Sequence, residues 1–471
     1  MDPIVDIVKH VVRARYEDLP KEAVEVTKKA IIDTIGSGIA GSSAPLGKMV
    51  ADQAREWGGK KQSTVFVYGD RVAAPEAAFA NSVMSRCREL DDVHEGNPKR
   101  GGGHGGHVHV MIVPGTLAMV ESSPKPVTGK KLILALALGG DLTVRLRLAA
   151  GEAGRVGWMS ETMSPFGVAA AGAKLFDLSE DVTASSMEAA FSFCSGSIHG
   201  SIHGTWGIWT PAGIGARGGV VAVDLARRGY VGAGSPLLTG AAGLYPLYFR
   251  NEFHKDILLS GLGEEFEGAN ASIKPYSCCK CTHHAIYTTL ELMKKHGITA
   301  GQVKSIKVRT CAYNMWLVVL NDKGEHKYAP RNLNEAQFSM PFTMATAMIK
   351  GTVFPDIFTD DILKDAEVLA LARKITVEST PEKDEIMKKQ GFPPDDVDIY
   401  TTDGKMYPGC EEFVKGHPRN PMSFADLEEK FHRCAKLSAK PIAEEKMAGF
   451  LKQAQELEEL EDVRGLVAQL S

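Results

Sequence analysis

Long apolar runs and an excess of one charge are both missing from this 471-residue chain. No run approaches the roughly 18 consecutive apolar residues that a membrane span requires. Residues 1–16 carry charges within their apolar stretch and lack the core and cleavage site of a signal peptide. Lysine and arginine total 54 against 58 aspartates and glutamates, whereas binding of nucleic acid or of an anionic membrane needs a strongly positive surface. We therefore expect a cytoplasmic protein that binds neither membranes nor nucleic acid.

Common short motifs of nucleotide and hydrolytic chemistry are also missing. The sequence has no Walker A motif, no GxGxxG following a strand, no GxSxG elbow and no HExxH. Nucleotide cofactors and serine hydrolysis are therefore disfavoured.

The eight cysteines do not form the pattern of a disulfide framework in a chain of this length. Three of them crowd into residues 278–281, directly before two histidines, which suggests zinc or an iron–sulfur cluster. Adjacent cysteines do not easily face one tetrahedral ion, however. We favour a cationic pocket wall in which Lys274, Lys280 and His283 face a carboxylate ligand, with a metal-binding protein as the alternative.

Apolar periodicity predicts helices over most of residues 1–268. Isoleucines and valines between residues 24 and 39 recur on one face at 100° per residue, and the alanine-rich stretches 131–138 and 167–174 follow. Only 7% of residues are aromatic, while 48 are glycine. Small residues let helices approach closely, so we expect tight helix packing at Gly139-Gly140, at Gly167 and from Gly196 through Gly219.

The pattern changes between about residues 270 and 410. Ile306 and Val308 alternate with charged residues, and segments 375–378 and 397–399 repeat this rhythm before the turn pair Asp403-Gly404. Helical stretches at 284–296 and 334–350 interrupt these predicted strands, and after Pro421 the chain returns to helix.

These patterns together predict a mainly α fold with two domains. A large all-helical domain takes residues 1–268 plus 415–471 and is discontinuous, and a smaller α+β lid domain, residues 269–414, is inserted into it. The glycine-rich segment 101–106 is expected to be a flexible loop.

Carboxylates and imidazoles gather around that loop. Residues 89–94 read Glu-Leu-Asp-Asp-Val-His, and His104, His107 and His109 follow. Such a group can supply a general base, a general acid and their orienting partners. The alternative is a solvated loop whose charges only keep it soluble.

Two further groups have both a binding and a structural interpretation. Arg145 suits bidentate binding of a carboxylate, but it also stands four residues after Asp141, the spacing of a helical ion pair. Tyr328 can donate a proton and Arg331 can hold a carboxylate, although capping and surface packing explain both equally well.

Six short segments carry a resemblance to a known family. They are Ile32–Gly36, Phe79–Asn81 leading to Leu90–Asp92, His107 seven residues before Pro114, Pro165–Ala171, Lys274–His283 and Lys415–Ser423. In this order they resemble the MmgE/PrpD family, which includes 2-methylcitrate dehydratase, cis-aconitate decarboxylase and iminodisuccinate epimerase. The chain is identified as a divergent member.

The resemblance implies a homodimer, no metal or organic cofactor, and a cleft between the two domains that holds small di- and tricarboxylates. It also implies proton abstraction next to a carboxylate, or loss of CO2, with cations stabilising the charge that develops. The catalytic candidates are His107 as base, Glu89, and His283 or Tyr328 as proton donor. The candidates for binding substrate are Lys274, Arg145, Asp92, Lys280 and Arg331.

Several departures from the family pattern concern the substrate. Glu89 stands where the family has aspartate, and Met159 or Ser160 stands at the place of a histidine. Residues 207–213 lack the lysine of the corresponding dehydratase and decarboxylase segment and include Trp209. These changes suggest a less polar or differently shaped substrate.

We therefore expect a cofactor-independent lyase, dehydratase- or decarboxylase-like, that acts on a small carboxylic acid. The alternative within the family is an isomerase or epimerase of a small dicarboxylate, in which no group leaves. From another class, a metal-binding protein or a non-catalytic carboxylate-binding protein remains open.

Overall fold

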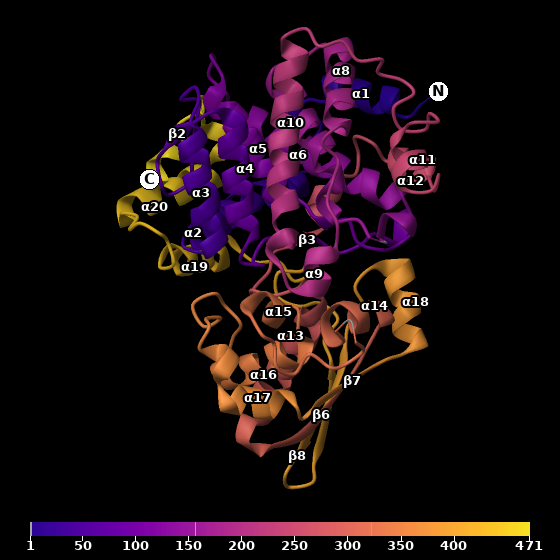
Figure 1. The fold of residues 1–471 in the computed structure, drawn as a ribbon, viewed down its shortest axis with the longest axis vertical. Helices are drawn as coiled ribbons and strands as arrows, with labels where there is room; N and C mark the ends of the chain where they lie inside the picture. The colour runs from indigo at the N-terminus through magenta and orange to yellow at the C-terminus, as the bar shows by residue number, and fades with distance from the viewer. Residues whose placement is uncertain (1, 156, 322) are drawn as a thin grey trace.

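The computed structural model describes residues 2–155, 157–321 and 323–471. Two parts lie one above the other in Figure 1, a helical body and a smaller part that contains a four-stranded sheet, here called the sheet module. Helix dominates both parts, so the predicted mainly α fold class is confirmed. The division of the chain at residues 268/269 and 414/415 stays a prediction.

The helical body contains most of the long helices. Its helices are α1 (Ile4–Arg13), α2 (Lys21–Ser42), α3 (Pro45–Trp57), α4 (Ala74–Arg86), α5 (His109–Ser122), α6 (Gly129–Ala149), α7 (Ser164–Leu175), α8 (Glu180–Phe191), α9 (His199–His203), α10 (Thr210–Arg227), α11 (Leu244–Tyr248), α12 (Lys255–Leu259), α19 (Phe424–Ala435) and α20 (Glu444–Gln455). The last two lie beside α2, which returns the C-terminal segment to the body (Figure 1).

The centre of the body is built from helices that are buried on nearly all sides. Almost every residue of α6 and α7 is buried, and α10 packs against α4, α7 and α8. The alanine-rich stretches predicted as helices fall within α6 and α7, and these predictions are confirmed. A Cβ atom added to Gly139 would lie 2.8 Å from the carbonyl oxygen of Gly167, so glycine permits the close approach of α6 and α7.

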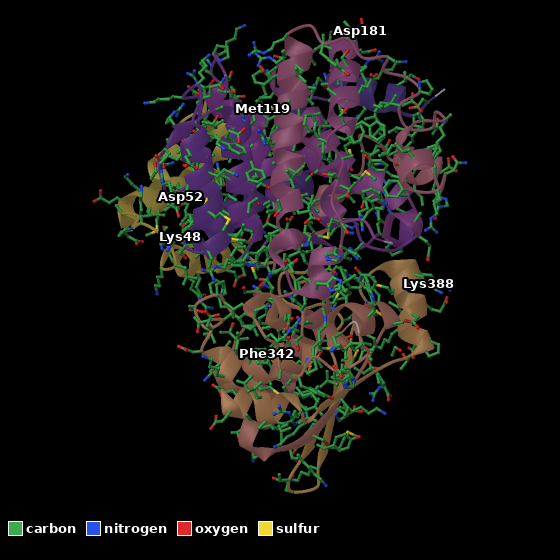
Figure 2. All side chains as sticks on the ribbon, in the orientation of Figure 1. Lys48, Asp52, Met119, Asp181, Phe342 and Lys388 are labelled. Atoms are coloured by element: carbon green, nitrogen blue, oxygen red, sulfur yellow. The ribbon has the colours of Figure 1, made fainter. Side chains whose placement is uncertain are left out.

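The sheet module contains both strands and helices. They are α13 (His283–His296), β6 (Val303–Thr310), α14 (Ala312–Asn314), α15 (Leu333–Gln337), α16 (Met340–Lys350), α17 (Ala366–Ala372), β7 (Ile375–Ser379), α18 (Pro381–Gln390), β8 (Asp396–Thr401) and β9 (Met406–Cys410). The strand order is β7-β6-β8-β9; β6 and β7 are parallel and the other pairs antiparallel. Both parts have a buried apolar core: Figure 2 labels Met119, a buried residue of α5 in the helical body, and Phe342, a buried residue of α16 in the sheet module.

The predicted strands and the hairpin turn at Asp403-Gly404 are confirmed, because β8 and β9 pair across that turn. The helical stretches predicted at 284–296 and 334–350 are confirmed by α13, α15 and α16, although the second is divided in two, since α15 ends before Phe338 and α16 begins after it. The side chain of Ser339 accepts a hydrogen bond from the amide of Phe342 and caps α16, and Pro341 favours a helix start there.

Small sheets join distant segments of the chain. Strands β1 (Ser63–Thr64) and β2 (Arg71–Val72) form one pair. In a second sheet, β3 (Val93–His94) lies between β4 (Gly106–His107) and β5 (Ala271–Ser272). The glycine-rich loop connects β3 to β4, and its Gly102 packs directly against the backbone of Lys388 at the end of α18. The loop therefore bridges the helical body and the sheet module.

None of the helices in the described ranges is both long and apolar enough to cross a membrane.

Replacing Gly167 by alanine tests the close contact between α6 and α7. The new methyl group meets the Thr143 hydroxyl and the Gly139 carbonyl, and such overpacking costs about 1–3 kcal/mol of unfolding free energy. Urea unfolding measures the change. Gly449→Ala, within α20 and without close neighbours, is the control and is expected to be neutral or stabilising. Equal stability of both variants would contradict the proposed contact.

Candidate active site

A small cavity of about 70 Å³ lies where the helical body meets the sheet module. The body contributes residues from the end of α4, from β4 and from the segment around Ser160, while the sheet module contributes Tyr313, Leu317, Phe338 and Phe392. Four of the predicted catalytic and binding residues line this one cavity, Glu89, His107, Lys274 and Lys280, and His104 from the same histidine group joins them. The structure therefore brings together side chains that are up to 191 positions apart in the chain.

Arg86, the last residue of α4, is the centre of the polar network at the cavity. Its guanidinium is fully buried and forms ion pairs with Glu89, with Asp91 at 3.5 Å and with Glu161 at 3.1 Å. Burial opposes the charge of Arg86, but the surrounding carboxylates outweigh it and raise the pKa of Arg86 above its ordinary value. Arg86 is therefore a permanent cation.

His107 in β4 is held by two partners of opposite charge. Its Nδ1 lies 2.6 Å from Oδ2 of Asp91, and its Nε2 lies 2.8 Å from Nη2 of Arg86. Because arginine is only a donor, Nε2 accepts this hydrogen bond and Nδ1–H donates to Asp91. The partners thus assign the Nδ1–H tautomer, with the lone pair of Nε2 covered by Arg86.

The neighbouring Gly106 allows this placement of His107. Gly106 has a positive φ of 78°, and a Cβ there would overlap the side chain of Ser160. The close approach lets the backbone N–H of His107 donate to Oγ of Ser160 over 3.2 Å, while the Ser160 hydroxyl donates to Glu161 over 2.8 Å.

Glu89 connects three parts of the chain. It accepts hydrogen bonds from Nε1 of Trp209 at 3.0 Å and from Nζ of Lys274 at 3.1 Å, besides its ion pair with Arg86. Burial alone would raise the pKa of Glu89, but Arg86 and Lys274 outweigh burial and lower it to about 2. Burial likewise opposes the charge of Lys274, and Glu89 and Asp91 more than compensate, so the pKa of Lys274 is raised.

Lys280 approaches the cavity from the turn before α13. Its Nζ lies 2.6 Å from Oε1 of Glu95 and 6.0 Å from the centre of the Phe392 ring. Burial would raise the pKa of Glu95, but Lys280 and nearby histidines lower it. Lys280 therefore reaches the cavity already paired with a protein carboxylate.

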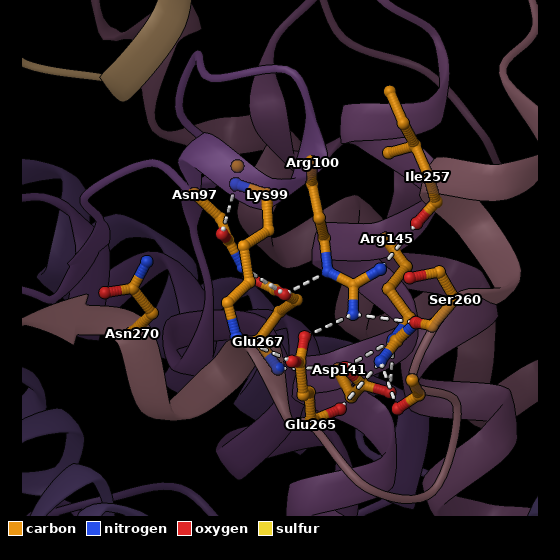
Figure 3. A network of polar contacts seen from close by, with 12 residues as sticks. Asn97, Lys99, Arg100, Asp141, Arg145, Ile257, Ser260, Glu265, Glu267 and Asn270 are labelled. Atoms are coloured by element: carbon orange, nitrogen blue, oxygen red, sulfur yellow. Dashed lines mark hydrogen bonds and ion pairs between the residues drawn. The ribbon is translucent and has the colours of Figure 1, made fainter.

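Two of the predicted binding residues have structural partners away from the cavity. Arg145 contacts both carboxylate oxygens of Asp141 and donates to the backbone carbonyls of Leu258, Ser260, Gly261 and Glu265, which fixes the loop after α12 (Figure 3). Asp92 accepts from the backbone N–H of His109 at 3.1 Å and lies 2.5 Å from its Nδ1, so it caps the start of α5.

The other three predicted residues also lie outside the cavity lining. His283 is buried, and its Nε2 contacts the carbonyl of Cys278 at 3.2 Å. Burial and the charges of Lys280 and Lys274 hold the pKa of His283 well below its usual range. Tyr328 contacts His326 at 2.8 Å, and Arg331, 81% exposed, pairs with Glu335.

Sequence reasoning missed several polar residues that line or support the cavity, among them Arg86, Arg147, Tyr313, Glu161 and Glu95. Arg86 is the lone basic residue in a helix of small and apolar side chains, a signal that could have identified it. Arg147 lies about 200° around α6 from Arg145, so the two arginines face different surroundings. No comparable signal marks Glu161 or Tyr313.

The cysteine-rich segment contributes to the cavity wall through Cys279 and Cys281. Cys278 instead contacts the hydroxyl of Thr282 at 3.1 Å. Among residues 2–155, 157–321 and 323–471, no group of three or more histidine, cysteine, aspartate or glutamate side chains is arranged to hold a metal ion.

Comparison with family models gives two matches along the chain. Residues 5–256 match the MmgE/PrpD N-terminal domain, and residues 276–455 match the MmgE/PrpD C-terminal domain. The resemblance found from short motifs is therefore confirmed.

Curated relatives are similar over most of their length but at low identity. A cis-aconitate decarboxylase-like protein of Aspergillus oryzae is 24% identical over 98% of this chain and 95% of its own. The cis-aconitate decarboxylase of Aspergillus terreus is 23% identical over 78% of this chain and 76% of its own. That of Homo sapiens is 22% identical over 94% of this chain and 89% of its own.

The low pKa of Glu89 predicts a pH effect on stability. Because its pKa is about 2 in the folded protein against an ordinary 4.5, the charged carboxylate stabilises the fold fully above about pH 4.5. This contribution is lost as the pH falls from about 4.5 toward 2. Removing the carboxylate in Glu89→Gln is expected to make the unfolding free energy fall less steeply over that range.

Urea unfolding at a series of pH values down to the lowest at which both proteins stay folded measures this slope. Glu382→Gln on the exposed face of α18 is the matched control and should keep the wild-type slope. The same slope for Glu89→Gln and wild type would show that Glu89 is not held charged in the fold.

Proposed function

The chain belongs to the MmgE/PrpD family, and from this premise we propose that it is an enzyme, a lyase that acts on a small carboxylic acid. The names of the relatives, cis-aconitate decarboxylases among them, support a lyase of this general type. The observation that carries the proposal is the placement of His107 at the cavity, oriented by Asp91 and covered by Arg86.

His107 is the proposed base. Its Nε2 can take a proton only after Arg86 releases it, and a substrate carboxylate is the natural new partner for the guanidinium. Binding of substrate would therefore uncover the base. Asp91, behind Nδ1, then stabilises the imidazolium that forms when the proton moves from carbon to Nε2.

Fixed cations stabilise the charge that develops on the substrate carboxylate. Arg86, Arg147, Lys274 and Lys280 all line the cavity, in surroundings from which most water is excluded. Preorganised charges of this kind stabilise a transition state strongly because they need no rearrangement during the reaction.

Tyr313 is the proposed proton donor. It lines the cavity, whereas His283 and Tyr328 do not. Burial raises the pKa of Tyr313, so its hydroxyl keeps its proton until a group leaves. In a dehydration that proton departs with hydroxide as water, and His107 holds the proton taken from carbon. In a decarboxylation His107 returns its proton to a neighbouring carbon, CO2 leaves its bonding electrons behind, and the proton of Tyr313 takes the place of CO2 on carbon. Every step uses side chains of this chain and calls for no metal or organic cofactor.

The homodimer that the family resemblance implies remains part of the proposal, as does the cytoplasmic location expected from the composition. Size-exclusion chromatography with light scattering tests the dimer.

His107→Gln tests the base directly. Loss of the base is expected to lower kcat by about 10²–10⁴-fold on any acid that the wild type converts, with the fold unchanged by circular dichroism. A screen of carboxylic acids by mass spectrometry identifies the reaction: loss of one water or one CO2 supports the lyase, and an unchanged product mass supports the isomerase. His254→Gln, at an exposed histidine that likewise pairs with a carboxylate, that of Glu252, is the control. Undiminished activity of His107→Gln would remove His107 from the mechanism.

Asp91→Asn tests the tautomer of His107. An asparagine amide can donate to Nδ1 and so favours a proton on Nε2, where it blocks the base. We expect kcat to fall by about 10²–10⁴-fold while KM changes little. An effect on KM alone would mean that Asp91 acts only on binding.

A further inference from the structure

The cations of the proposed active site are already neutralised by the protein. Arg86 contacts three carboxylates, those of Glu89, Asp91 and Glu161, and Lys274 shares Glu89. Lys280 pairs with a further carboxylate, Glu95. A substrate carboxylate therefore competes with protein carboxylates at each of these three cations.

The formal charges around the cavity balance. The side chains that carry a full charge in its lining are four cations, Arg86, Arg147, Lys274 and Lys280, and one anion, Glu89. Three further carboxylates, Asp91, Glu95 and Glu161, pair with Arg86 or Lys280, which makes four anions in all. His104, Tyr313, Cys279 and Cys281 also line the cavity and are taken as neutral. With His107 in the Nδ1–H tautomer, one bound carboxylate leaves a single unbalanced charge, and three carboxylates leave three. Unbalanced charge is costly in a buried site, so the balance disfavours polyanions.

The remainder of the cavity wall is mostly apolar. Met159, Ile198, Ile208, Leu317 and Phe338 all line it, and each is buried or half-buried. Met159 is one of the two candidates for the place where the family pattern has a histidine. None of these five side chains can bind a second carboxylate, whereas all can contact a hydrocarbon group.

We infer that the ligand of this cavity is a monocarboxylate with an apolar substituent, and not a di- or tricarboxylate. The inference rests on the proposed function for the location of the site. The single carboxylate draws Arg86 away from His107, and the apolar substituent lies against Leu317 and Phe338.

Isothermal titration calorimetry on the full chain tests this inference with three saturated acids that cannot lose water. They are 3-methylbutanoate, methylsuccinate and tricarballylate, which carry one, two and three carboxylates. We expect 3-methylbutanoate to bind at least about tenfold more tightly than either of the others. Equal or tighter binding of methylsuccinate or tricarballylate, or no binding of 3-methylbutanoate, would overturn the inference.

Leu317→Lys adds a cation to the apolar wall. The substitution is expected to weaken the binding of 3-methylbutanoate and to strengthen the binding of methylsuccinate. The ratio of their Kd values should therefore change by about tenfold or more. Leu247→Lys, at a leucine that is 62% exposed on α11, is the matched control and should leave the ratio unchanged. An unchanged ratio in a folded Leu317→Lys protein contradicts the assigned wall. If that variant does not fold, the wild-type titrations decide.

The two proposals fail in different ways. Tight binding of 3-methylbutanoate without turnover of any acid would refute the lyase and leave the ligand class standing. Turnover confined to di- or tricarboxylates would refute the ligand class and leave the lyase standing.

Discussion

The burial of Arg86 is the constraint on which the candidate site depends. A buried guanidinium without partners is strongly destabilising, and removing one partner of a buried ion pair costs about 3–5 kcal/mol. The partners of Arg86 come from separate segments: Glu89 follows α4, His107 is in β4 and Glu161 is in a short turn before α7. Satisfying one cation therefore fixes three walls of the cavity at once.

Glu89 extends this constraint to the rest of the molecule. Its φ of 51° lies in the left-handed region, which is strained for a residue other than glycine. A strained backbone of this kind persists only where contacts to the residue hold it in place. At Glu89 these contacts come from Arg86, Lys274 and Trp209, which all bind the Glu89 carboxylate. Through these contacts the start of α10 and the segment after β5 meet the end of α4. The same carboxylates that hold the cavity together also limit how many negative charges a bound ligand can carry.

Sequence patterns within short segments predicted the fold well. The features that these patterns did not predict depend on contacts between segments that are distant in the sequence. Periodicity located α2, α6, α7 and the strands β6, β7 and β8 because each buries one or more faces at its own spacing. Motif resemblance identified His107, Lys274 and Glu89, which do share one cavity. It did not separate Arg145 from Arg147, because both faces of α6 are buried and only the neighbouring loop decides which arginine faces the cavity. Arg331 resembled a binding residue, yet its local pair with Glu335 holds it at the surface.

Arg86 and Asp91 together hold His107 with its proton on Nδ1 and its Nε2 lone pair covered. Nitrogen-15 NMR of protein labelled at the histidine rings measures this most directly, with His107 assigned by the signal that is lost in His107→Gln. We expect a protonated Nδ1 and an unprotonated Nε2 in the free protein. A proton on Nε2 would contradict this expectation, because Arg86 could then not donate to that nitrogen.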